Sequence, residues 1–168
     1  EYFMKYEEEP PSGLTGEWTG FRGERFDNVV ETPDKINTEA GDYPVVWSFE
    51  TGEGHAAPVI YKGRVYVLDY NESLNSDALR CFSLESGKEL WRRWYRVPMK
   101  RNHGFLRTVP VIRDEYVITI GPQGHVMCCD PVTGDLKWGI DMQKQFKTEV
   151  PFWYTGQCPC VDDDVLVL

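Results

Sequence analysis

The residues best suited to bind a ligand lie in a basic segment that spans 92–107. It holds six of the 18 Lys and Arg residues and no Asp or Glu, and its charge of +6 leaves −15 for the rest of a chain whose net charge is −9. A basic strip on an acidic body attracts anionic ligands, and Trp94 and Tyr95 could add stacking to sugars or to a cationic partner. The alternative is that acidic loops neutralise the strip while its arginines alternate outwards into solvent.

The cysteines and histidines do not have the spacing of a metal site. The chain has five Cys and three His but no Cys-x-x-Cys, no haem-attachment motif and no metal-ligand spacing, so we expect no zinc site. The odd total means that at least one thiol is free or pairs outside the segment. Cys158 and Cys160 are two apart, so in a strand both face the core or both face a cleft.

Composition excludes several classes of protein. The 168 residues are 41% hydrophobic and 27% charged, and 14% aromatic content rules out disorder throughout. No apolar run approaches the ~20 residues of a membrane span, and the acidic balance argues against binding nucleic acid through bulk charge.

The run Glu7–Gly13 holds no regular element and is expected to be an exposed arm.

The chain contains an internal repeat. Short apolar runs that open at Pro58, Pro110 and Pro159 each continue through a polar turn into a second β-rich run, which is typical of a hairpin. A second pattern follows the first two hairpins, because 81–91 aligns with 128–138 at an offset of 47. Each copy reads as a strand, a tight turn with Gly, and a returning strand with Trp.

Two hairpins per unit and a period near 45 to 50 predict blades of a β-propeller. We expect an all-β fold with an arm over 1–44 and a partial propeller over 45–168, divided into blades of about 48–95, 96–145 and a truncated 146–168. Val45–Trp47 is expected to be the last strand of an earlier unit, and the best helix, near Met142–Phe146, is one turn at most. The ring is therefore incomplete, and its open edges are expected to pair with other blades or another chain.

The second pattern resembles the docking motif of pyrroloquinoline-quinone (PQQ) repeat propellers, Ala-x-Asp-x-x-Thr-Gly-x-x-x-Trp. Cys replaces Ala in both copies, and the first copy also has Ser at the Asp and Thr positions. A second resemblance lies nearer the start of the chain, where Trp18 with Phe21-Arg22-Gly23 is similar to the Trp-x-x-Phe-Arg-Gly segment of large secreted bacterial members. The motif residues expected to be structural are Gly87, Trp91, Asp130, Thr133, Gly134 and Trp138. Trp91 and Trp138 should each be buried beside the turn of their own blade.

Family resemblance implies a fold, and the chemistry stays open. The preferred interpretation is a non-catalytic periplasmic or secreted module that presents a face to a protein or an acidic glycan and has no cofactor. The alternative is a PQQ-dependent alcohol or sugar dehydrogenase, with calcium, whose catalytic residues lie in other blades. A third is a glycan-processing enzyme.

The resemblance also places two polar residues at equivalent positions. His55 and Arg107 lie three residues before Pro58 and Pro110, where propeller residues approach the central channel. Together with members of the basic strip, they give the ligand-binding candidates His55, Arg96, Lys100, Arg101, His103 and Arg107. The alternative is that polar groups merely fill a wet channel mouth. His125, after Gly124, is expected to be a turn residue.

Two features resemble parts of a quinone site. Quinone-dependent alcohol dehydrogenases carry a disulfide between adjacent cysteines, and Cys128–Cys129 are adjacent; however, Cys128 and Cys81 both occupy the small buried position of the motif, which favours a packing role. Trp153 could be a platform under a quinone ring, but a core or interface role is favoured.

Overall fold

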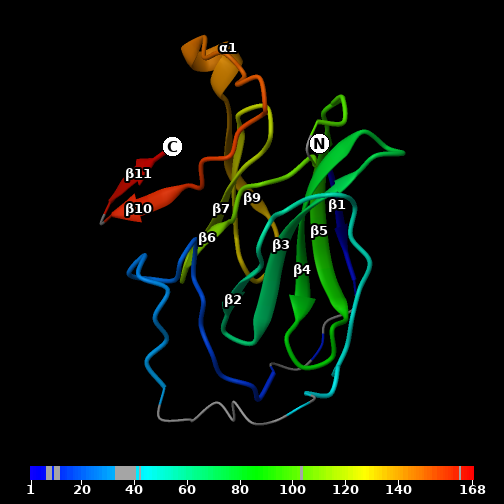
Figure 1. Cartoon of the computed structure of the whole chain (residues 1–168), viewed down its shortest axis with the longest axis vertical. Helices are drawn as coiled ribbons and strands as arrows, with labels where there is room; N and C mark the ends of the chain where they lie inside the picture. Colours follow the sequence, from blue (N-terminus) through cyan, green and yellow to red (C-terminus); the bar gives the residue numbers. More distant parts are fainter. Residues whose placement is uncertain (7–8, 10–11, 33–40, 42, 103, 163) are drawn as a thin grey trace.

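The computed structural model describes the chain except for residues 7–8, 10–11, 33–40, 42, 103 and 163, which form the thin grey trace in Figure 1. The predicted all-β architecture is confirmed. Among the described residues, the regular elements are two antiparallel sheets, one small hairpin and a single helical turn. His103 and part of the predicted exposed arm lie outside the described residues.

The first sheet is a propeller blade with an added outer strand. Its four blade strands are β2 (Val59–Tyr61), β3 (Arg64–Asn71), β4 (Ser76–Ser83) and β5 (Glu89–Arg96), and they pair in sequence order. The fifth strand, β1 (Tyr2–Lys5), pairs antiparallel with β5 and covers its outer edge. The start of the arm is therefore part of the sheet.

The second sheet repeats the blade without the added strand. Its strands are β6 (Val111–Arg113), β7 (Tyr116–Ile120), β8 (His125–Cys129) and β9 (Leu136–Asp141), again in sequence order. The helical turn α1 (Met142–Phe146) follows β9, as the sequence predicts. Asp141 caps it by accepting a hydrogen bond from the amide of Lys144 at 3.1 Å.

The two blades also share an irregularity of the backbone, a shift of strand register at equivalent positions. The register shifts at Cys81/Phe82 in the first blade and at Cys128/Cys129 in the second, 47 residues later. The motif turns are also equivalent, since the amides of Gly87 and Gly134 donate to the carbonyls of Ser83 and Asp130 at 3.0 and 2.9 Å. Bulges are specific features of a strand pair, so their recurrence marks the two sheets as copies of one unit.

The core forms in layers between these sheets. One face of the first blade packs on the second through Tyr66, Leu79 and Trp91, which meet Ile112 and Val117. Its opposite face is covered by Trp47 and Phe49, which pack on Phe82. The far face of the second blade is covered by the hairpin of β10 (Cys160–Asp162) and β11 (Val165–Val167). Blades thus bury their apolar faces against their neighbours, as propeller blades do.

The tryptophans dock on the following blade, which corrects the prediction that each packs beside its own turn. The indole of Trp91 donates to the carbonyl of Pro131 at 3.3 Å, and Trp47 makes the equivalent bond to Leu84 at 2.9 Å. A Cβ on Gly134, whose φ is 76°, would lie 2.7 Å from the Trp91 ring, so glycine is required there. Trp91 is fully buried, as predicted, whereas Trp138 is 39% exposed, and no third copy of the motif turn lies among the described residues to cover it.

Two further segments lie outside the named strands. Val45–Trp47 forms no β-ladder with any described residue, and Val45 and Val46 are 82% and 79% exposed. The segment that starts at Trp18 crosses both blades, because Trp18 pairs with Ile60 beside β2 and the carbonyl of Thr19 accepts from the amide of Ile112 at 2.9 Å. This opening segment therefore ties the two innermost strands together. The described strands do not close a ring (Figure 1).

Candidate ligand-binding face

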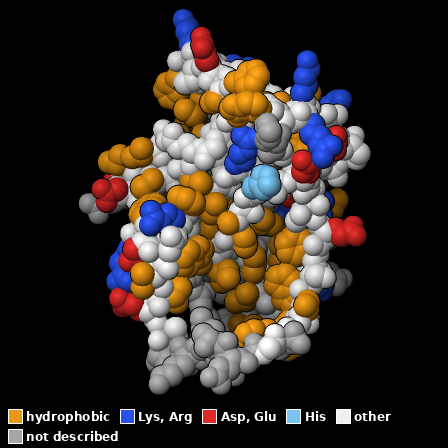
Figure 2. All heavy atoms as spheres, in the orientation of Figure 1, with side chains coloured by type: hydrophobic (Ala, Val, Ile, Leu, Met, Phe, Trp, Pro, Cys, Tyr) orange, Lys and Arg blue, Asp and Glu red, His pale blue; other side chains and the backbone are white. Residues whose placement is uncertain are grey.

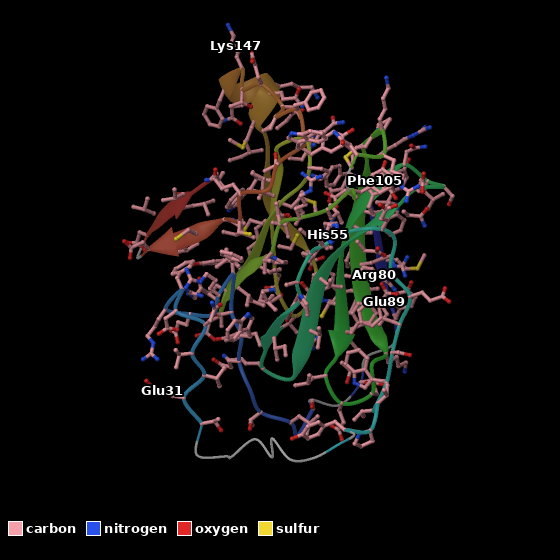
Figure 3. All side chains as sticks on the ribbon, viewed as in Figure 1. Glu31, His55, Arg80, Glu89, Phe105 and Lys147 are labelled. Atoms are coloured by element: carbon pink, nitrogen blue, oxygen red, sulfur yellow. The ribbon has the colours of Figure 1, made fainter. Side chains whose placement is uncertain are left out.

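Loops from successive blades converge on one face of the molecule. The segment before β2 runs beside the segment before β6, with the amide of His55 bonded to the carbonyl of Leu106 at 2.7 Å and a parallel bridge between Gly54 and Leu106. The segment before β10 joins them through the Sγ atom of Cys158, which accepts from the amide of Val109 at 3.2 Å. His55 and Phe105 are both labelled in this region of Figure 3. We refer to the described residues of the loops 53–56, 100–107 (without 103) and 151–155 as the loop face.

The predicted ligand residues on this face have distinct environments. His55 is exposed and lies against Gly104. Arg101 forms an ion pair with Glu53, with Nε and Oε2 2.7 Å apart. Arg107 is used structurally, since its guanidinium donates to the carbonyls of Asn102 and Trp153. Figure 2 shows a histidine with basic side chains beside it, at the rim of a hollow lined by hydrophobic groups.

Three of the six cations of the basic strip are neutralised by carboxylates, one on the same strand, one before β1 and one on the loop that precedes β2. Arg92 is bonded to Glu89, and Arg93 is bonded to Glu1 and to the carbonyl of Gly134. Arg101 makes the third pairing with a carboxylate. The remaining exposed cations, Arg96 and Lys100, have no side-chain ion pair or hydrogen bond among the described residues.

The two aromatic residues of the strip are not available for stacking on a ligand. Trp94 is stacked on Tyr2 of β1, with ring centroids 5.6 Å apart. Tyr95 donates its hydroxyl proton to Asp77 and packs on His125. Both side chains are therefore occupied within the fold.

The aromatic groups that face solvent come from another loop. Phe152 and Trp153 are 79% and 48% exposed and form an edge-to-face pair with ring centroids 4.7 Å apart. Their backbone is bonded to the basic loop, through Asn102 to the carbonyl of Phe152 and through Arg107 to that of Trp153. The sequence signal is the run Phe-Trp-Tyr at 152–154, although the family resemblance points only to Trp153, as a possible quinone platform.

A buried polar cluster lies between the two blades. Asp77 is 1% exposed, and its Oδ1 atom has no hydrogen-bond partner among the described residues. Burial raises the pKa of Asp77 to about 7, although the hydrogen bond from Tyr95 opposes the rise. Gly121 of the second blade touches this pair so closely that a Cβ would overlap the Tyr95 hydroxyl. The blades can meet here only because this position is glycine.

His125 belongs to the same interface, which corrects its prediction as a turn residue. It opens β8, packs on Tyr95 at 4.9 Å between ring centroids, and lies 3.8 Å from Asp141. Burial lowers the pKa of His125, although the charge of Asp141 opposes the shift. A cavity of about 180 Å³ lies between the blades, lined by Glu1, Tyr95, His125, Asp141 and the apolar residues of β8 and β9.

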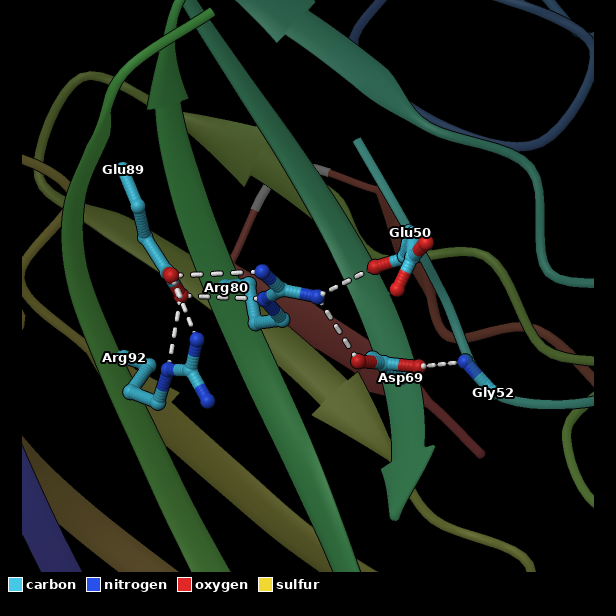
Figure 4. Close-up of polar contacts among 6 residues, drawn as sticks. All are labelled: Glu50, Gly52, Asp69, Arg80, Glu89 and Arg92. Carbon is cyan, nitrogen blue, oxygen red and sulfur yellow. Dashed lines mark hydrogen bonds and ion pairs between the residues drawn. The ribbon is translucent and has the colours of Figure 1, made fainter. Parts of the chain in front are cut away.

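A second polar cluster fixes the loop that precedes β2 (Figure 4). Arg80 is 9% exposed and makes a bidentate pair with Glu89, at 2.9 and 3.2 Å, while its other nitrogen bonds Asp69 and the carbonyl of Glu50. Asp69 in turn accepts the amide of Gly52 at 2.7 Å. Burial raises the pKa of Glu89, but hydrogen bonds from Arg92 and Arg80 outweigh it and lower the pKa. The cluster holds residues 50–52 against the blade.

The described residues do not fit a quinone–calcium site. No group of three or more His, Cys, Asp or Glu side chains suited to a metal occurs among them. Cys128 and Cys129 are free thiols that pack in different clusters on opposite faces of β8. Burial raises the pKa of Cys129 to about 12, which leaves it a neutral packing residue.

Comparison with known structures supports the fold but does not identify a chemistry. The chain has a TM-score of 0.64 and 17% identity with quinohemoprotein alcohol dehydrogenase from Comamonas testosteroni, over 89% of this chain and 22% of that one. It has a TM-score of 0.50 and 17% identity with a europium-containing methanol dehydrogenase, over 73% and 22%. With BamB from Moraxella catarrhalis the values are 0.49 and 20%, over 72% and 32%. The chain thus spans about a fifth to a third of the length of these proteins.

No described helix is long and apolar enough to cross a membrane.

Sequence comparison places the chain in a family, although no curated protein matches it. The family model described as outer membrane protein assembly factor BamB matches residues 75–168, which is more than half of the chain. With its repeated motif and its propeller blades, the chain therefore belongs to this family of PQQ-like repeat β-propellers.

Proposed function

We propose that the chain is part of a non-catalytic, exported β-propeller that binds a partner through the loop face. The observation that carries this proposal is the exposed pair Phe152 and Trp153, held by hydrogen bonds beside the basic loop 100–107. Exposed aromatic groups on a rigid backbone are typical of binding surfaces, because little conformational entropy is lost when a partner covers them. The partner is a protein or an acidic glycan.

The titratable groups with strongly shifted pKa values support a structural role. Asp77 is enclosed between the blades against the half-buried Tyr95, and Cys81 and Cys129 lie in the core. A catalytic acid or base must reach its substrate within hydrogen-bond distance. These buried groups contribute instead to how the blades pack.

The second candidate is a quinone-dependent dehydrogenase. It is favoured by the similarity in fold to quinohemoprotein alcohol dehydrogenase over most of the chain, at an identity that supports the fold alone. In that case the calcium ligands and the base would come from other blades, since the described residues supply no such set.

Reconstitution separates the two functions. The full-length protein is incubated with calcium and pyrroloquinoline quinone, and bound quinone is followed by its absorbance and by reduction of an artificial dye with alcohols and sugars. We expect neither bound quinone nor dye reduction. Stoichiometric quinone together with substrate-dependent dye reduction would overturn the proposal and establish the dehydrogenase.

A further inference from the structure

We propose that Phe152, Trp153 and Lys100 form a binding site for an acidic oligosaccharide, in which the two rings stack on sugar and the ammonium group pairs with a uronate carboxylate. This inference rests on the proposed function, because it names the ligand of the loop face. It assigns the stacking role to residues 152 and 153 in place of Trp94 and Tyr95, which are occupied within the fold.

The first argument is the rigidity with which the two rings are presented. The hydroxyl of Tyr154 both accepts from the amide of Lys100 at 2.9 Å and donates to its carbonyl at 2.8 Å. The amide of Thr155 bonds the carbonyl of Pro122 at 2.8 Å. Tyr154 itself has φ of 65°, an uncommon conformation for a residue with a side chain. These bonds hold a strained turn, and the turn directs the rings of Phe152 and Trp153, which precede Tyr154, towards solvent.

The second argument is the distribution of charge around the rings. Lys100 is exposed, has no ion pair among the described residues, and is tied through its backbone to the aromatic loop. Arg101 is 70% exposed and shares its charge with Glu53. Arg92, Arg93 and Arg107 are held by carboxylates or carbonyls. The other exposed cation without an ion pair among the described residues, Arg96, ends β5 and lies outside the loop face. The cationic charge that the loop face leaves for a ligand therefore lies at the start of loop 100–107.

The third argument is the size of the apolar surface. A standard protein interface covers about 800 Å² on each partner around an apolar core. Here the large exposed apolar groups of loop 151–155 are two rings, which expose part of the ~150–250 Å² that each aromatic side chain offers. The polar side chains of Asn102 and Arg107 are bonded to the backbone carbonyls of these two residues. The interplanar angle of 87° makes the pair a corner. A corner of this size matches one or two sugar rings.

The experiment uses a matched pair of ligands. The full-length protein is titrated calorimetrically with hexagalacturonate and with its methyl ester, which has the same rings without the negative charge. We expect hexagalacturonate to bind roughly two- to fivefold more tightly than the ester at low salt, and equally at high salt. Trp153→Ala and Phe152→Ala should each weaken both ligands roughly three- to tenfold.

Substitutions elsewhere serve as controls. Lys100→Gln should abolish the preference for the acid over the ester, whereas Lys137→Gln on β9 should leave it intact. Phe146→Ala removes an aromatic group that is 59% exposed on α1, and it should leave both affinities unchanged. The midpoint of thermal unfolding is measured for each variant, so that lost folding is separated from lost binding.

The outcomes are distinguishable from those of the proposed function. Absence of binding to hexagalacturonate, equal affinity for acid and ester at low salt, or wild-type affinity in Trp153→Ala would each overturn the glycan site. A protein partner whose binding depends on Trp153, without any glycan binding, would overturn it as well, while the proposed binding function would stand. Quinone-dependent activity overturns the proposed function whatever the titrations give.

Discussion

At the scale of single residues, the least ordinary group is the carboxyl of Asp77. It is enclosed between two blades, and its described partner is the hydroxyl of Tyr95. Burial of a carboxylate disfavours its charged form, so the folded protein holds the proton that the unfolded chain releases. The raised pKa therefore makes stability depend on pH in a direction opposite to that of a salt-bridged carboxylate.

We predict that Asp77→Asn stabilises the protein above neutral pH. The pKa of Asp77 is about 7 in the folded protein, against the ordinary 3.8 of an aspartate. The stability contributed by the neutral acid is therefore complete below the lower pKa and is lost as the pH rises through about 7. The stability gained by Asn over Asp should therefore grow by about 2 kcal/mol between about pH 5 and about pH 7.5. Urea unfolding of both proteins at the two pH values measures this.

The matched control is Tyr95→Phe. It keeps the buried acid and removes the hydrogen bond that favours its ionised form, so the loss of stability with rising pH should become steeper than in the wild type. A constant difference between Asp77→Asn and the wild type across this pH range would show that Asp77 is ionised in the folded protein throughout.

At the scale of elements, two kinds of contact hold the blade to its surroundings. Arg80 of β4 links β3, β5 and residues 50–52 through a largely buried network (Figure 4). Tryptophan on the last strand of one blade links it to the motif turn of the next. In the first contact, the charge of Arg80 is balanced by several partners. The second contact combines burial of the indole ring with one hydrogen bond.

We predict that Arg80→Ala lowers the free energy of unfolding by ~3–5 kcal/mol, because it leaves Glu89 and Asp69 buried without their common partner. Lys62→Ala breaks the exposed pair with Asp114 and should leave the unfolding midpoint unchanged. Chemical denaturation of the two variants tests the contrast. Equal effects would mean that the network contributes no more than a surface ion pair.

Trp91 and Trp138 occupy equivalent positions in successive blades, and we expect them to contribute differently to stability. Trp91→Ala should cost ~3–5 kcal/mol, since the ring is fully buried against Gly134. Trp138→Ala in the 168-residue chain should cost clearly less, because 39% of its surface is exposed. Unfolding of the two variants in denaturant measures the difference, and the same cost for both would show that Trp138 is covered in solution.

At the scale of the whole molecule, the described chain leaves apolar surface at its two outer faces. Val45 and Val46 are exposed beside the first blade, and Val165 and Val167 are 60% and 51% exposed on the hairpin. Further blades or a second chain would cover these faces in a closed propeller.

We predict that the 168-residue chain associates as its concentration rises. The exposed valines and the open strand edges offer surface for pairing between copies. Light scattering coupled to gel filtration should give a mass that increases with loading, and Val46→Lys with Val165→Lys should shift it towards the monomer. A constant monomer mass in the unsubstituted chain would contradict the prediction.

The sequence by itself determined the blade. Alternating apolar runs, the offset of 47 between motif copies and the paired Gly and Trp positions are local properties of the chain, and they predicted the strands, the turns and the single helical turn α1. The family follows from the same residues. The motif at Trp18 marks the opening segment, although nothing local in the sequence indicates that this segment bridges β2 and β6.

Contacts between blades were decided only by the tertiary structure. The sequence placed Trp91 beside its own turn, whereas packing placed it on the next blade, and Trp138 stayed exposed because its partner depends on what lies beside β9. Likewise, the charges of residues 92–107 predict one basic site. In the structure Arg92 and Arg93 point to opposite faces of β5, so they have different partners. Side chains that meet across a propeller are distant in sequence, so their pairing is set by the relative placement of the blades, and no local pattern encodes it.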